Sequence, residues 1–119
     1  MARIPWDVEE IVAFIDLFER TKDTGFLSDY ELQAFSTTLI RRADILGIMH
    51  DDVFRNLNGM KMMYQNVEYI ASDGKHGLSG ASKAFQEVYQ MRTKCPYVFS
   101  MILEEFNRKY RSTGNAAEQ

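Results

Sequence analysis

Cysteine is nearly absent from this chain of 119 residues, and the single thiol, Cys95, excludes any internal disulfide. No apolar run approaches the roughly 18 residues that a membrane-spanning helix needs. The first residues, Met1 to Asp7, lack the continuous apolar segment of a signal peptide. With neither an export signal nor a disulfide, we expect a cytoplasmic protein without a membrane partner.

Sets of catalytic or metal-binding residues are also lacking. His50-Asp51-Asp52 shares no ligand spacing with His76, so we interpret it as a loop histidine beside a capping aspartate. Cys95 has no identifiable partner base, which favours a small buried residue over a nucleophile. The acids Glu9-Glu10 and Glu104-Glu105 are adjacent, point to different helix faces, and are expected at the surface. We therefore expect no enzyme, no cofactor and no bound metal.

Long β-branched runs, internal repeats and sustained heptads are missing, whereas apolar residues recur with a helical period. The spacing predicts helices over about 8–22, 28–46, 60–70, 81–92 and 96–106. Ser28 and Glu31 form a capping box, Gly47 is a plausible stop, and Asn58-Gly59 predicts a turn before the third helix. Residues 71–80 form a polar loop in which one short hairpin remains an alternative.

The apolar stripes predict which side of each helix is buried. In the second helix they place Leu46 inward, and in the fifth helix they place Val98, Ile102 and Phe106 inward. The resulting fold class is all-α: a compact bundle of about five helices with a helix-turn-helix-like core. Residues 1–111 are predicted to form a single helical domain, and residues 112–119 a flexible polar tail.

Charge is divided unevenly along the chain. Residues 1–40 hold eight acids and three bases, a balance of −5, while residues 41–111 hold eleven bases and eight acids, a balance of +3. Such asymmetry suggests a nucleic-acid face in the second part, although two ordinary solvated surfaces explain it equally well.

Hydrogen-bonding side chains crowd into the segment from Arg55 to Asn66. The segment contains Arg55, Asn56, Asn58, Lys61, Gln65 and Asn66. Lys61 and Gln65 would share an outward face, as in a recognition helix at a DNA groove. The structural alternative is that Arg55 pairs with Asp51 or Asp52 and that the asparagines form turns.

A glycine-rich loop follows, running from Gly74 to Gly80 ahead of a helix. It lacks the full phosphate-loop pattern and a preceding strand, so a nucleotide site is improbable. Lys75, Ser79 and Lys83 could still hold one backbone phosphate of a nucleic acid. An ordinary loop followed by a helix cap is the alternative.

Three motifs resemble one known family. Trp6-Asp7-Val8-Glu9-Glu10, then Phe54-Arg55-Asn56-Leu57-Asn58-Gly59 with Lys61 and Asn66, then Gly77-Leu78-Ser79 with Ser82-Lys83 follow one another in order. Together they resemble the N-terminal accessory domains that precede HNH nuclease modules in bacterial restriction-type endonucleases. The match spans roughly residues 6–106, and no nuclease signature follows.

The resemblance implies a non-catalytic domain that recognises double-stranded DNA in restriction-modification or phage defence. The expected DNA-binding residues are Arg55, Asn56, Asn58, Lys61, Gln65, Lys75, Ser79 and Lys83. The chain would then be a recognition fragment or a stand-alone relative. The alternative function is a protein-interaction module, or a phage- or plasmid-borne regulator that engages a defence complex. It is motivated by the acidic N-terminal half of the chain with its many aromatic and methionine residues.

Overall fold

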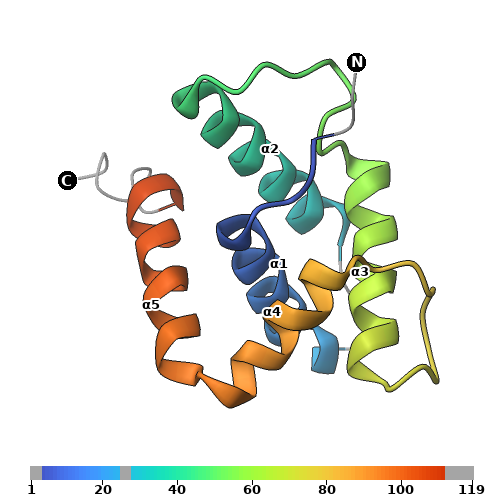
Figure 1. Ribbon diagram of the computed structural model, residues 1–119. Helices are drawn as coiled ribbons and strands as arrows, with labels where there is room; N and C mark the ends of the chain where they lie inside the picture. The colour runs from blue at the N-terminus through green and yellow to red at the C-terminus, as the bar shows by residue number, and fades with distance from the viewer. Residues whose placement is uncertain (1–3, 25–27, 112–119) are drawn as a thin grey trace.

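A computed structural model describes residues 4–24 and 28–111 of the chain. Its elements are α1 (Val8–Thr21), η1 (Lys22–Thr24), α2 (Asp29–Leu46), α3 (Leu57–Ala71), α4 (Lys83–Lys94), α5 (Pro96–Phe106) and the π-helical turn η2 (Asn107–Arg111). The described residues contain no strand, so the all-α bundle of five α-helices is confirmed and the alternative hairpin near 70–80 is absent (Figure 1). The predicted tail, 112–119, lies outside the described residues.

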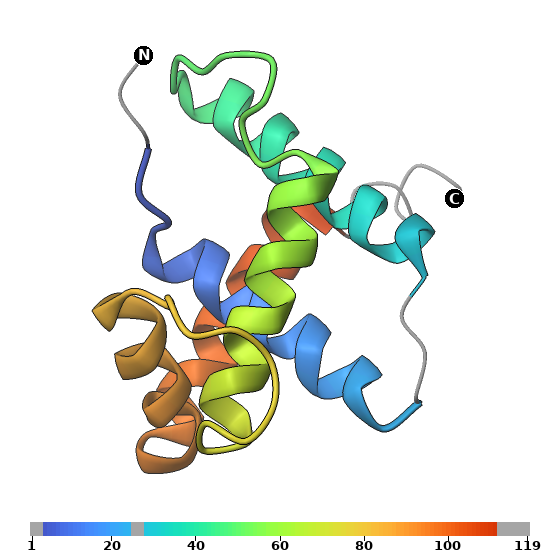
Figure 2. The same ribbon diagram turned by 90° about the vertical axis from the view of Figure 1, so that its right-hand side faces the viewer.

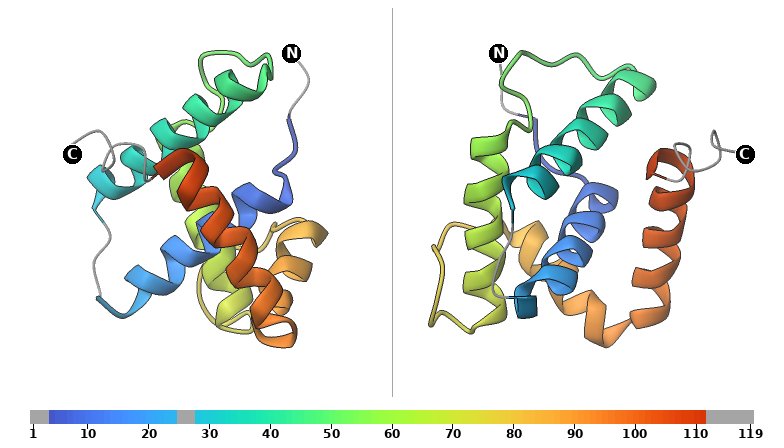
Figure 3. Two further views of the ribbon diagram at one scale, coloured as in Figure 1. Left: turned by 90° about the vertical axis from the view of Figure 1, so that its left-hand side faces the viewer. Right: turned by 180° about the vertical axis from the view of Figure 1, so that it is seen from behind.

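α1 is the central helix. Five consecutive residues, Ile11 to Ile15, have no exposed surface, so other elements enclose this stretch of the helix on every side. α3, α4 and α5 all pack against α1, as Figures 1 and 3 show. Asp7 and Glu10 cap the start of this helix reciprocally, so its first turn is fixed at the point where the chain enters the core.

Helix boundaries differ from the sequence prediction mainly at α3. This helix begins at Leu57, because the side chain of Asn56 accepts a hydrogen bond from the Gly59 amide at 2.9 Å. Asn58 and Gly59 therefore lie inside the first helical turn, and the prediction of a separate turn there was wrong. Residues 47–56 connect α2 to α3, a longer connection than the three- or four-residue turn of a helix-turn-helix motif.

Three side chains that were predicted to be buried are exposed: Leu46, Val98 and Cys95. In α5 the buried positions are Phe99 and Phe106. Because these larger rings take the inward face, Val98 is turned outward. No helix in the described ranges has the length and apolar content to cross a membrane.

Candidate functional site

Arg55 was expected at the surface, but its side chain is only 7% exposed. Its Nε and Nη2 atoms each donate to the Glu10 carboxylate at 2.9 Å, and its Nη1 and Nη2 atoms donate to the carbonyl oxygens of Ile4 and Pro5 at 3.2 Å. Glu10 is itself almost fully buried, so its prediction as a surface acid was wrong as well. The pair consumes the guanidinium donors that a DNA base would need.

Two aromatic rings enclose the same guanidinium. The carbon Cζ of Arg55 lies 4.5 Å from the ring centroid of Trp6 and 4.3 Å from that of Phe54. The Trp6 motif and the Phe54-Arg55 motif, far apart in sequence, therefore meet in one buried clamp. Arg55 is therefore held inside the fold, and the prediction that its side chain is exposed was wrong. The sequence contains one signal for the burial of Glu10. The spacing of Asp7 and Glu10 is that of a capping pair, which places Glu10 next to the buried Ile11.

The glycine-rich loop is also a structural feature. Asn66 donates from Nδ2 to the carbonyl oxygen of Leu78 at 2.9 Å, and the Leu78 amide donates to the carbonyl oxygen of Gln65 at 3.1 Å. Gly77 has a φ of +85°, and a Cβ there would lie 2.3 Å from the same Gln65 oxygen. The loop is thus fastened along α3 by contacts that only glycine permits. Ser82 caps α4 by accepting from a backbone amide.

The other predicted DNA-binding residues are at the surface, except Asn56, which is half-buried as the α3 cap. The exposed ones are Asn58, Lys61, Gln65, Lys75, Ser79 and Lys83. They come from α3, the loop fastened to it and the start of α4, which Figure 2 turns toward the viewer. Lys61 and Gln65 are one helical turn apart on α3, as predicted. Lys61 lies 3.2 Å from Asp29, and Lys83 lies 3.9 Å from Glu87.

The uneven charge of the two parts of the chain is largely neutralised inside the fold. Acids from residues 1–40 pair with bases from residues 41–111, in the pairs Asp7–Arg42, Glu9–Arg42, Glu9–Lys109, Glu10–Arg55, Glu19–Arg92 and Asp29–Lys61. Burial alone would lower the pKa of Arg42, but Asp7 and Glu9 outweigh it and raise that pKa. Five of the eleven bases of the second part, Arg42, Arg55, Lys61, Arg92 and Lys109, are therefore paired within the fold.

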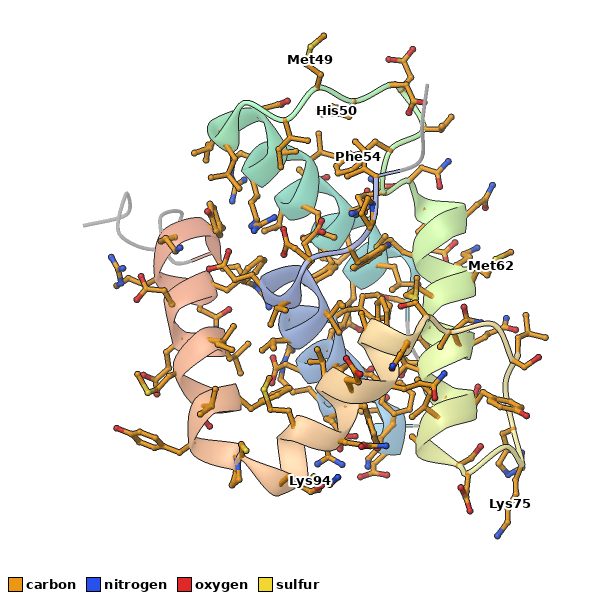
Figure 4. The ribbon with its side chains drawn as sticks, viewed as in Figure 1. Met49, His50, Phe54, Met62, Lys75 and Lys94 are labelled. Atoms are coloured by element: carbon orange, nitrogen blue, oxygen red, sulfur yellow. The ribbon has the colours of Figure 1, made fainter. Side chains whose placement is uncertain are left out.

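A different surface lies at the end of α2 and in the connection to α3, in residues 45–53, which we call the 45–53 segment. Its four exposed apolar side chains are Ile45 (61%), Leu46 (49%), Met49 (84%) and Val53 (64%). Met49 points away from the body of the molecule in Figure 4, above His50 and Phe54. Sequence analysis missed this surface, although the apolar run on both sides of Gly47 exceeds what one helix face can bury.

The 45–53 segment is held in place by its own hydrogen bonds. α2 ends at Gly47 with a φ of 74°, and the Ile48 amide donates to the Ala43 carbonyl oxygen at 2.9 Å. Further on, Asp51 accepts from the Val53 amide at 3.1 Å through its side chain. The buried Phe54 ring follows directly. Such a segment presents its apolar side chains in a preformed arrangement.

His50 connects the two ends of this segment. Its Nε2 atom lies 2.8 Å from the Asp44 carboxylate, its Nδ1 atom lies 3.0 Å from the Asp51 carbonyl oxygen, and its ring stacks on Phe54 at 4.8 Å. Both oxygen partners can only accept, so the protonated imidazole alone satisfies both bonds. These contacts, first that to Asp51 and then that to Asp44, raise the pKa of His50 above its ordinary value.

Among the described residues, no group of three or more histidine, cysteine or acidic side chains could hold a metal ion. No protein family matches the chain, and neither a curated protein nor a solved structure matches it. The likeness to HNH-nuclease accessory domains therefore remains a prediction that rests on the three motifs. The features established by the structure are an all-α bundle, a buried arginine clamp and the exposed, ordered 45–53 segment.

Proposed function

We propose that this domain is a non-catalytic module that binds a protein partner through the 45–53 segment. The observation that carries the proposal is the exposure of Ile45 and Leu46 at the end of α2 and of Met49 and Val53 in the connection that follows. Exposed apolar side chains grouped in one short stretch of the chain favour a protein interface, and methionine adapts to irregular partner surfaces. The internal pairing of the basic side chains favours this alternative over DNA.

Capture of a partner tests the proposal. Immobilised wild-type protein is incubated with a nuclease-treated bacterial lysate, beside a Met49→Ser/Val53→Ser variant and a Met101→Ser variant. Met101 is 54% exposed on α5, so it controls for the loss of an exposed apolar side chain. A protein retained by wild type and Met101→Ser, but not by the double variant, is then identified and purified for titration.

The magnitude follows from the exposed area. Burying one large apolar side chain contributes about 1.5–3 kcal/mol, so Met49→Ser should weaken binding of the purified partner about 10- to 100-fold. Equal affinities for wild type and Met49→Ser would contradict the proposal. A circular-dichroism spectrum identical to that of wild type ensures that the variant is folded.

DNA binding is the second candidate function, and the outer face of α3 favours it. Asn58, Lys61 and Gln65 remain exposed there, with Met62 at 60% exposure beside them. Lys61→Ala should weaken binding to all duplex sequences alike and reduce the salt slope by about one, whereas the distant Lys94→Ala should not. Fluorescence anisotropy at low and moderate salt, with methylated and unmethylated duplexes, measures this. No binding to either duplex at low salt would exclude this candidate.

A further inference from the structure

The 45–53 segment carries two acids, Asp51 and Asp52, and its one basic side chain, His50, is engaged with Asp44. The sequence holds no lysine or arginine between Ala43 and Phe54. The flanking bases, Arg42 and Arg55, have buried side chains that are paired with acids near the start of α1. Their charge is therefore neutralised in the interior. Arg41, which is exposed one turn before Ile45, donates through its guanidinium to the Tyr110 carbonyl oxygen. The exposed acids Asp51 and Asp52 carry the charge beside Met49 and Val53.

Two of these aspartates, Asp51 and Asp52, are exposed. Asp51 accepts one backbone hydrogen bond through Oδ1, which leaves acceptor capacity on its second oxygen. The third acid, Asp44, is engaged with His50. A partner that covers the apolar side chains must come close to Asp51 and Asp52, and it is recognised best if it brings positive charge to them.

We infer that the partner presents a cationic amphipathic helix to this segment, an inference that rests on the proposed function. Its apolar stripe would cover Met49 and its apolar neighbours, and lysine or arginine beside the stripe would meet Asp51 and Asp52. An extended peptide would find no sheet edge in the described part of the fold. A second copy of the chain docked through the same segment would bring Asp51 and Asp52 toward the same aspartates, which disfavours it.

The probe is a fluorescent peptide of about 18 residues, in which leucine at helical spacing forms one face and lysine the other. Two control peptides accompany it: one with glutamate in place of lysine, and one with the leucine and lysine residues scrambled. Anisotropy titration should give the leucine/lysine helix an affinity at least about tenfold tighter than either control. Equal binding of the scrambled peptide, tighter binding of the glutamate peptide, or no binding of the leucine/lysine helix would overturn the inference.

Matched variants locate the contact. Asp51→Asn/Asp52→Asn should weaken peptide binding about three- to tenfold and reduce its salt dependence, and asparagine at position 51 can still accept the Val53 amide. Asp73→Asn is the control, since Asp73 is exposed on another loop and its positive φ suits asparagine equally. Met49→Ser should weaken binding further, and Met101→Ser should not. Equal effects of the Asp73 and Asp51/Asp52 changes would contradict the assigned surface.

Failure of this inference is distinguishable from failure of the proposed function. If the peptide does not bind but a lysate partner is lost specifically by Met49→Ser/Val53→Ser, the segment binds a protein of different chemistry. If that variant retains every partner of the wild type, the docking function itself is wrong.

Discussion

Replacing Arg55 by alanine should destabilise the fold by about 3–5 kcal/mol, because it leaves the Glu10 charge buried without a partner. The Glu10 side chain is only 3% exposed, and after loss of the guanidinium it keeps the Asp7 amide as a hydrogen-bond donor but no positive charge. The contacts of that guanidinium with the rings of Trp6 and Phe54 are lost at the same time. Since a domain of this size is stable by about 5–15 kcal/mol, the variant should lose a large share of its stability.

Urea unfolding followed by far-ultraviolet circular dichroism measures the effect, in a cycle of Arg55→Ala, Glu10→Ala and the double variant. The double variant removes both charges, so its loss should be smaller than the sum of the single losses by at least about 1.5 kcal/mol. Lys61→Ala is the control. Its pair with Asp29 joins two half-exposed side chains, and exposed pairs contribute about 0–1 kcal/mol.

A loss below about 1 kcal/mol for Arg55→Ala, or strictly additive losses in the cycle, would refute the buried clamp. It would also restore Arg55 as a surface residue with a role in binding.

Three further predictions concern the ends of helices and the loops. Gly77→Ala should lower the free energy of unfolding by about 2–4 kcal/mol, because the new Cβ meets the backbone of α3 and the φ is positive. Gly47→Ala should lower it by only about 1–2 kcal/mol, because the site has open space and only the positive φ is unfavourable for alanine. Asn56→Ala should lower the free energy of unfolding by about 1 kcal/mol because it removes the α3 cap, whereas Asn58→Ala in the first turn should change it by less than about 0.5 kcal/mol. Thermal and urea unfolding measure both variants. The pKa of His50 is raised above 6.5 in the fold, so the contribution of His50 to stability is complete below pH 6.5 and is lost as the pH rises through the folded-state pKa. The difference in unfolding free energy between wild type and His50→Gln should therefore shrink as the pH rises. A constant difference from pH 5 to 9 would contradict this prediction.

Local patterns were sufficient to predict the helices. The apolar period and the capping residue Ser28 act within a few residues of themselves, so the sequence shows them directly. The start of α3 was misassigned because Asn56, and not Asn58-Gly59, provides the cap. A strong turn dipeptide is tolerated in a first helical turn, where the amides have no helical partner in any case.

Side-chain partners from distant parts of the chain could not be predicted. Arg55 was weighed against Asp51 and Asp52, its neighbours in sequence, but its partner is Glu10 on the central helix. The same limit affected the charge pattern. A basic excess suggested a nucleic-acid face, whereas the fold brings acids such as Glu9 and Glu19 onto those bases. Pairing of this kind depends on tertiary packing, which composition does not encode.

Photocrosslinking from three exposed methionines tests the central claim most directly. Met49 lies on the 45–53 segment, Met62 on the outer face of α3 and Met101 on α5, and all three are more than half exposed (Figure 4 labels the first two). A photoreactive residue replaces each in turn, and the products formed in a bacterial lysate are separated into protein and nucleic-acid adducts. The account predicts a discrete protein adduct from position 49 and none from position 101. A nucleic-acid adduct from position 62, with no protein adduct from position 49, would contradict it.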